Sequence, residues 1–156
     1  MQLEWYGQSA FRLTDGATTV FIDPFDDLGA LTARGLRWDY PGIAGVAADL
    51  LLVTHEHRDH NGVGAIGGDP VTLRSTAGRL DSPIGEVVAV AAEIATRLRA
   101  RVVVPMHYRT ERIDFLEPVD AFVERIGGTQ RLESAAFELD ALPDGDGPLA
   151  LVPAAP

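Results

Sequence analysis

Alternating apolar and polar positions open the chain and predict strands joined by tight turns. Strands are expected at residues 3–6, 10–13 and 18–22. Asp15-Gly16 supplies a hairpin turn between the last two strands. Asp23-Pro24 then ends the pairing, because proline has no N–H to donate, and the glycine- and proline-dotted stretch to residue 48 is expected to be a loop.

Two short, fully apolar runs predict strands buried inside a sheet. They are residues 50–53 and 102–104. Further strands are expected at 71–74, 131–132 and 149–152, with a loop at 81–83. A short helix could begin within 61–66, although Gly62 and Gly64 disfavour it.

One helix is expected after Pro118, a residue that suits a first turn. Its predicted apolar face consists of Val119, Phe122, Val123 and Ile126, and Gly127-Gly128 supply a stop. The preceding segment has two readings. Residues 86–90 form a strand that runs into a helix-like 92–98, or the apolar positions from Val87 to Leu98 belong to one continuous helix.

Composition narrows the class of protein. A chain of 156 residues with 46% hydrophobic content predicts one domain over residues 1–156. The absence of cysteine excludes disulfides, thiolate metal sites and cysteine nucleophiles, and the absence of lysine excludes Schiff-base chemistry. A net charge of −10 disfavours nucleic acid as a partner. No signal peptide or membrane-spanning run is visible, so a cytoplasmic protein without a membrane partner is expected.

The histidines gather at the ends of the two apolar runs. Three of the four lie in the segment Thr54-His55-Glu56-His57-Arg58-Asp59-His60, directly after residues 50–53, and His107 follows the second run. Imidazole and carboxylate are suitable ligands for zinc and related divalent ions. In an extended turn His55 and His57 would point to one side, and Asp59 and His60 would reach a neighbouring point. This spacing suits two metal centres close together.

The same segment matches the HxHxDH motif, and the chain resembles the metallo-β-lactamase superfamily. Three further segments are similar to its lactonase-like branch, that of the ascorbate-6-phosphate lactonases. They are Trp5-Tyr6-Gly7-Gln8-Ser9-Ala10-Phe11, Phe21-Ile22-Asp23-Pro24 and Val104-Pro105-Met106-His107-Tyr108. The resemblance runs from residue 3 to about residue 122. It implies an α/β fold, the αββα sandwich of two mixed sheets flanked by helices.

The resemblance also implies a ligand set. His55 and His57 would bind a first metal, and Asp59, His60 and His107 a second. The cofactor would be one or two divalent ions, zinc foremost, with manganese or iron as alternatives. A bridging hydroxide would attack the substrate, and Asp59 would act as a catalytic residue by orienting it or accepting a proton. Asp23 could support a metal-bound histidine, or simply form an Asp-Pro turn.

The chain departs from the family pattern in two ways. Gln8 stands where many relatives have histidine, and an amide does not titrate near neutrality. Between His60 and His107 the family supplies another first-metal histidine and a bridging aspartate, and neither is present here. We therefore expect a shortened sandwich with some strands missing and a deletion junction near Ala91. A homo-oligomer could cover the shortened sheet.

The expected function is metal-dependent hydrolysis of a small-molecule ester, lactone or phosphoester through a metal-activated hydroxide. The alternative is a catalytically impaired metal-binding or assembly module that lacks first-metal ligands. Arg74 and Arg109 could hold an anionic substrate, although surface arginines more often have no such role.

Overall fold

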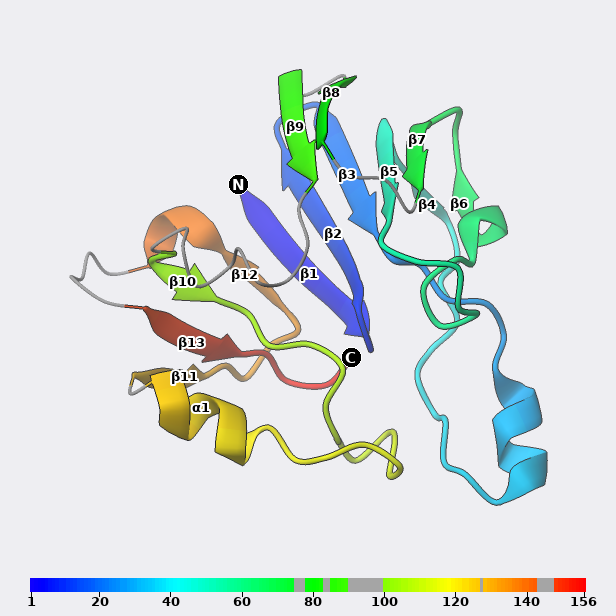
Figure 1. Ribbon diagram of the computed structural model, residues 1–156, viewed down its shortest axis with the longest axis vertical. Coiled ribbons are helices and arrows are strands. Elements are labelled where there is room, and N and C mark those ends of the chain that lie inside the picture. Colours follow the sequence, from blue (N-terminus) through cyan, green and yellow to red (C-terminus); the bar gives the residue numbers. More distant parts are fainter. Residues whose placement is uncertain (75–77, 83–84, 90–99, 127, 143–147) are drawn as a thin grey trace.

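The N-terminal strands form the centre of a six-stranded mixed sheet. The computed structural model describes residues 1–74, 78–82, 85–89, 100–126, 128–142 and 148–156 (Figure 1). The strands are β1 (Gln2–Gly7), β2 (Ala10–Asp15), β3 (Thr18–Ile22), β5 (Leu50–Val53), β7 (Val71–Arg74) and β12 (Ala136–Glu138), in the order β12-β1-β2-β3-β5-β7. Pairing is antiparallel from β12 to β3 and parallel from β3 to β7.

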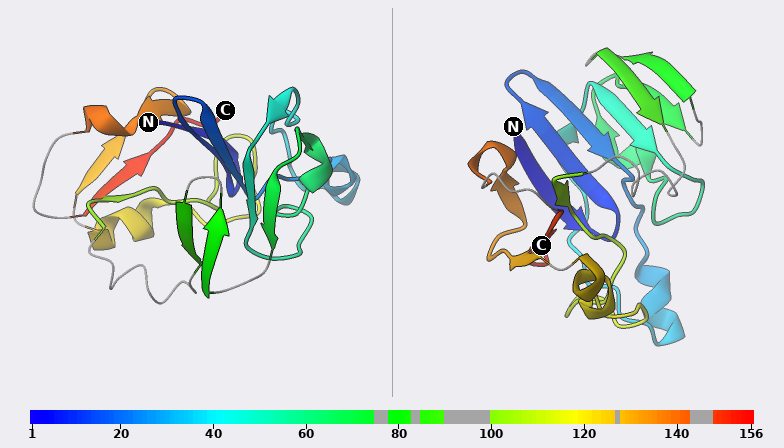
Figure 2. Two further views of the ribbon diagram at one scale, coloured as in Figure 1. Left: turned by 90° about the horizontal axis from the view of Figure 1, so that it is seen from above. Right: turned by 60° about the vertical axis from the view of Figure 1, so that its left-hand side comes forward.

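A second, parallel sheet lies beside the first, with the α-helix next to it (Figure 2). Its strands are β10 (Val102–Val103), β13 (Leu149–Val152) and β11 (Thr129–Arg131), and the helix is α1 (Asp120–Ile126). Two smaller pairs are β4 (Val46–Ala47) with β6 (Ile66–Gly67), and β8 (Gly78–Ser82) with β9 (Gly85–Ala89). The 3-10 turns are η1 (Gly29–Arg34), η2 (Val63–Ala65) and η4 (Leu139–Ala141).

The six-stranded sheet buries side chains on both faces, because successive residues of a strand point to opposite sides. One face packs on β13 and α1, through the cluster Leu3, Trp5, Phe11, Tyr108, Val119, Val123, Ala150 and Val152. The other face packs on the loop after β3 and on the β4–β6 pair, with Phe21, Phe25, Tyr40, Leu51 and Ile66 among its members. The sheet is therefore the middle layer, and its strand ends are held from both sides.

Most of the expected strands are present. The opening strands, residues 50–53 and residues 71–74 were placed correctly by their apolar pattern, and β5 lies between two parallel neighbours as a buried run should. β9 supports the strand reading of residues 86–90 and contradicts the continuous helix, because Val87, Val88 and Ala89 are extended. The rest of that segment, including the expected junction near Ala91, lies outside the described residues.

Four expectations were wrong in detail. The loop at 81–83 is not a loop at its start, since Asp81 and Ser82 belong to β8. β10 is half-buried because it is the edge of its sheet. Phe122 is exposed, so the buried face of the helix is narrower than its apolar pattern. The helix within 61–66 is only the single turn η2.

The expected sandwich of two mixed sheets flanked by helices also needs correction. Among the described strands the six-stranded sheet is mixed, whereas the three-stranded sheet that packs beside it is parallel. Within the described part of the chain α1 is the one α-helix, and a loop covers the opposite face instead of a helix. No helix among the same residues is long and apolar enough to cross a membrane.

Gly62 offers a test of how tightly the loop after β5 is packed. A Cβ atom at this position would lie 2.3 Å from the backbone carbonyl carbon of Phe25, and backbone cannot swing aside. We expect Gly62→Ala to cost about 1–3 kcal/mol through overpacking, which lowers the melting temperature by roughly 2–12 °C in a domain of this size. Thermal unfolding followed by circular dichroism measures the shift.

Gly64 is the matched control, since a Cβ there would have open space. Gly64→Ala should keep the melting temperature or raise it slightly, because alanine restricts the unfolded chain. Equal shifts in the two variants would show that the Gly62 contact does not constrain the fold.

Candidate metal centre

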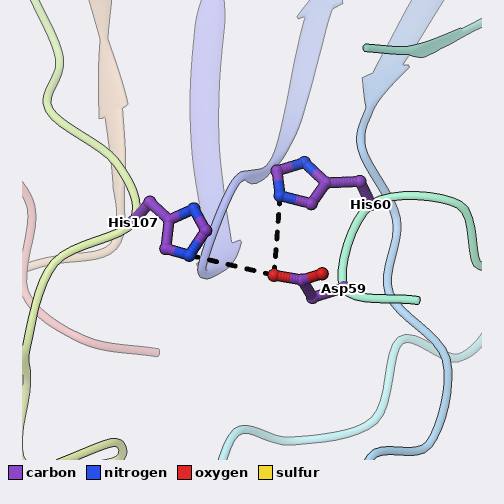
Figure 3. A group of neighbouring side chains, drawn as sticks. All are labelled: Asp59, His60 and His107. Atoms are coloured by element: carbon purple, nitrogen blue, oxygen red, sulfur yellow. Dashed lines mark ion pairs between the residues drawn. The ribbon is translucent and has the colours of Figure 1, made fainter. Parts of the chain in front are cut away.

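Three ligand side chains converge at the ends of the sheet strands. The carboxylate of Asp59 lies between two imidazoles, with its Oδ2 atom 3.5 Å from His60 Nε2 and 3.8 Å from His107 Nε2 (Figure 3). All three ligand atoms lie within 4.8 Å of one another. Ligand atoms of a tetrahedral zinc ion are separated by about 3.3–3.6 Å, because each is about 2.0–2.2 Å from the metal. The spacing thus needs only a small contraction to hold one ion.

His60 is oriented by Asp23. Its Nδ1 atom lies 2.9 Å from Asp23 Oδ2, and the Ser9 hydroxyl oxygen is also 2.9 Å from that nitrogen. When Nδ1 donates its proton to the carboxylate, Nε2 keeps a lone pair directed toward Asp59. A carboxylate behind a histidine fixes the tautomer in this way in many metal sites. Asp23 is therefore more than the Asp-Pro turn that was the simpler reading.

The same carboxylate orients His55 through Thr54. The Thr54 hydroxyl donates to Asp23 Oδ2 at 2.7 Å, and His55 Nδ1 lies 3.0 Å from that hydroxyl oxygen. A hydroxyl has one proton, so an oxygen that donates to Asp23 can only accept from His55. His55 then carries its proton on Nδ1 and presents Nε2 as a free ligand atom. The Thr54 N–H also donates to Asp23 Oδ1, at 2.7 Å.

The remaining histidine of the motif, His57, packs next to His55. The two ring centroids are 4.7 Å apart, and the rings of His55 and His60 are 3.9 Å apart. The fold brings all five expected ligands into one neighbourhood. Among the described residues, however, the group whose ligand atoms converge is Asp59, His60 and His107, the trio expected for the second metal.

Backbone strain is concentrated at the centre. Only three non-glycine residues within the described ranges have positive φ: Gln8 at 54°, Asp23 at 45° and His107 at 61°. This region is costly for residues with a Cβ atom and is found preferentially at functional sites. Gln8 also anchors the distant ligand, since its carbonyl oxygen accepts from the His107 N–H at 3.2 Å.

The residues of the trio fit a divalent cation. Gln8 is buried, and its Nε2 donates to Asp59 Oδ2 at 3.2 Å. Its Oε1 atom is also buried and finds no hydrogen-bond partner among the described residues. An unpaired buried oxygen costs free energy unless an ion or a bound water satisfies it. Partial burial lowers the pKa of His107, which favours the neutral imidazole that binds metal.

Fold and donor set together define a class, a metal-binding sandwich of β-sheets with ligands at the strand ends. The model of the beta-lactamase superfamily domain matches residues 2–87, more than half of the chain. The chain therefore belongs to the metallo-β-lactamase superfamily.

Curated relatives include proteins named UPF0173 metal-dependent hydrolase. One from Nitratidesulfovibrio vulgaris is 44% identical over 61 residues, which is 39% of this chain and 23% of the relative. One from Thermus thermophilus is 38% identical over 96 residues, 62% of this chain and 34% of the relative. The aligned segments thus span about a third or less of those relatives' length.

A solved structure has the same fold. It comes from Thermotoga maritima, from a protein proposed to be a Zn-dependent hydrolase of the metallo-beta-lactamase superfamily. The superposition has a TM-score of 0.64 at 18% identity and covers 97% of this chain and 98% of the other. The arrangement of the sheets is thus shared from end to end.

The sequence predicts that the Gln8 amide positions other groups by hydrogen bonding, and its Nε2 atom donates to Asp59. Sequence reasoning missed the supporting roles of Thr54 and Ser9. Thr54 was quoted as part of the motif, yet its hydroxyl links Asp23 to His55. The Ser9 hydroxyl oxygen lies 2.9 Å from His60 Nδ1. Neither role leaves a signature in residue spacing, because Thr54 lies 31 positions from Asp23 and Ser9 lies 51 positions from His60. The expected substrate contacts of Arg74 and Arg109 find no support either: Arg74 pairs with Glu56, and Arg109 donates to the Leu116 carbonyl oxygen.

Asp23 allows a test of this hydrogen-bond network. We expect Asp23→Asn to weaken zinc binding by about 10–100-fold, since the amide nitrogen cannot accept from His60 Nδ1. Thr54→Val removes the hydroxyl while keeping the side-chain shape, so it should weaken only the ion that depends on His55. Zinc titration against a coloured chelator measures both affinities.

Asp26→Asn is the control, because Asp26 is an exposed carboxylate three positions away and its loss changes the net charge equally. Wild-type affinity in Asp23→Asn, or the same loss in Asp26→Asn, would contradict the role given to Asp23.

Proposed function

We propose that this chain is a metal-dependent hydrolase acting on a small ester, lactone or phosphoester. The observation that carries the proposal is the convergence of Asp59, His60 and His107. Asp59 and His60 are oriented by side-chain hydrogen bonds, and His107 by a strained backbone conformation. The metal-dependent hydrolase names of the curated relatives agree with it. We propose zinc as the ion because histidine and aspartate are common zinc ligands, and because zinc dependence is proposed for the Thermotoga maritima neighbour.

The chain's own groups divide the work at this centre. A divalent ion, when bound, supplies hydroxide near neutral pH and polarises the substrate oxygen. His60 and His107 hold the site, and Asp59 is placed to orient the attacking oxygen and accept its proton. Gln8 fixes one carboxylate oxygen of Asp59 through Nε2, which leaves Oε1 to accept a hydrogen bond from water. As an amide, Gln8 positions these groups without exchanging protons itself.

The finer proposals are the lactonase-like branch and the number of ions. The segment from Trp5 to Phe11 is one of the three that carry the likeness to that branch, and Gln8 and Ser9 within it support the ligands directly. Asp59, His60 and His107 would hold one ion, and His55 with His57 would contribute to a second.

Metal content and turnover of single variants test the function. Asp59→Asn and His107→Ala should each lose zinc from the trio and lower ester or lactone hydrolysis by about 100-fold or more, the scale on which essential acid–base and metal groups act. His57→Ala should reduce the zinc content without emptying the trio. Zinc is quantified by mass spectrometry after gel filtration, and turnover with generic ester, lactone and phosphodiester substrates.

Asp39→Asn is the control, since Asp39 is an exposed partner of Arg112 and lies outside the trio. It should keep wild-type zinc and activity. Zinc-loaded wild-type protein without turnover on any of the three substrate types would refute the hydrolase. That result would favour the alternative, a metal-binding or assembly module whose folded state is stabilised by zinc binding.

A further inference from the structure

A pocket opens beside the metal group. Its volume is about 350 Å³, within the range of sites for small organic ligands. Gln8 and Asp59 form part of its wall, so a ligand in the pocket touches the catalytic side of the centre. The opposite wall comes from the loop after β3, which includes the turn η1.

Two arginines line this pocket in a protein with a net charge of −10. The Arg34 guanidinium forms no ion pair or hydrogen bond within the described residues. Among the residues that the structure describes, the Arg58 guanidinium donates to the backbone carbonyl oxygen of Asp27 alone, at 3.2 Å. The Asp27 carboxylate itself accepts from the Gly29 N–H and leaves the guanidinium unneutralised. The pocket therefore keeps two cationic groups that no carboxylate of the described chain satisfies.

The rest of the wall is apolar. Leu31, Trp38 and Phe115 line the pocket, and Phe115 is 37% exposed although it is a large aromatic side chain. Exposed apolar surface next to a polar centre is characteristic of a binding site. Such a wall suits a hydrocarbon chain.

We propose that the pocket selects substrates with an apolar body and a terminal anionic group, a carboxylate or a phosphate. This inference rests on the proposed function. The guanidinium groups of Arg34 and Arg58 bind the anion, Trp38 and Phe115 contact the hydrocarbon, and the scissile ester lies toward Asp59. Guanidinium pairs with either anion through two parallel N–H···O bonds.

The reaction on such a substrate is hydrolysis. The oxygen of water forms a bond to the acyl carbon, the ester C–O bond breaks, and the departing alcohol oxygen takes up the proton. The products are a carboxylic acid and an alcohol. The anionic terminus is unchanged, so its contact with the arginines contributes binding and orientation alone.

Matched esters test the selection. 4-Nitrophenyl hydrogen adipate carries a free carboxylate, and its methyl ester has the same reacting carbonyl without that charge. Wild-type protein should hydrolyse the anionic ester with the higher kcat/KM after subtraction of spontaneous hydrolysis. Arg34→Gln and Arg58→Gln should each lower this value about three- to tenfold, and should lower the kcat/KM of the neutral ester by a smaller factor.

Arg131→Gln is the matched control. Arg131 is an exposed residue of β11 paired with Asp120, and its loss changes the net charge by the same amount. A loss of anionic selectivity in Arg131→Gln equal to that in Arg34→Gln and Arg58→Gln would reduce the effect to overall charge and overturn the proposal. Equal turnover of both esters by wild-type protein would also overturn it.

Binding separates this inference from the proposed function. Zinc-loaded protein is titrated calorimetrically with hexanoate, butyl phosphate and neutral hexanamide. Tighter binding of the anions, weakened in Arg34→Gln and Arg58→Gln but not in Arg131→Gln, supports the pocket even when no ester is hydrolysed. Comparing hexanoate with butyl phosphate identifies the preferred anion. Affinities unchanged by both pocket substitutions would refute the inference, whatever the activity.

Discussion

The buried carboxylate of Asp23 is the constraint on which the centre depends. Asp23 is fully buried, and burying an unpaired carboxylate is very costly. Its oxygens therefore need partners, and they find the Thr54 N–H and hydroxyl and the His60 ring. The parallel pairing of β3 with β5 makes this meeting unavoidable, because the carboxyl ends of both strands lie side by side. Two histidines, His55 and His60, are aligned from this one group, so a single aspartate organises both halves of the ligand motif.

Gln8 performs the corresponding task for His107. Its carbonyl oxygen accepts from the His107 N–H and from the Trp5 indole at 3.0 Å. Trp5 in turn stacks on Tyr108, with ring centroids 5.3 Å apart, inside the core between the two sheets. The ligand that comes from the second half of the chain is thus positioned by the packing of that core. Buried aromatic pairs favour particular ring orientations in addition to burying apolar area, so they fix the positions of the residues beside them.

The motif residues and the opening strands could be predicted because their signals are local. The continuous apolar run of β5 leads directly into His55, Asp59 and His60, and β1 and β7 alternate apolar and polar residues. Sequence does not predict the narrow buried face of α1 or the edge position of β10, because each depends on which elements pack beside it. The pocket is a similar case: Arg58 is part of the motif, while Arg34 and Phe115 come from distant segments whose meeting no spacing encodes.

The metal-ligand trio joins distant parts of the chain, and this affects the rates of folding and unfolding. Asp59 lies in a loop of the six-stranded sheet and His107 in a loop of the three-stranded sheet. The trio therefore forms only after the two sheets have packed together. Contacts so distant in sequence form late in folding, because their loop-closure entropy must be overcome first. An ion that needs all three ligands then stabilises the native state more than the folding transition state. Bound metal is expected to slow unfolding and to leave the folding rate nearly unchanged, so it stabilises the protein kinetically.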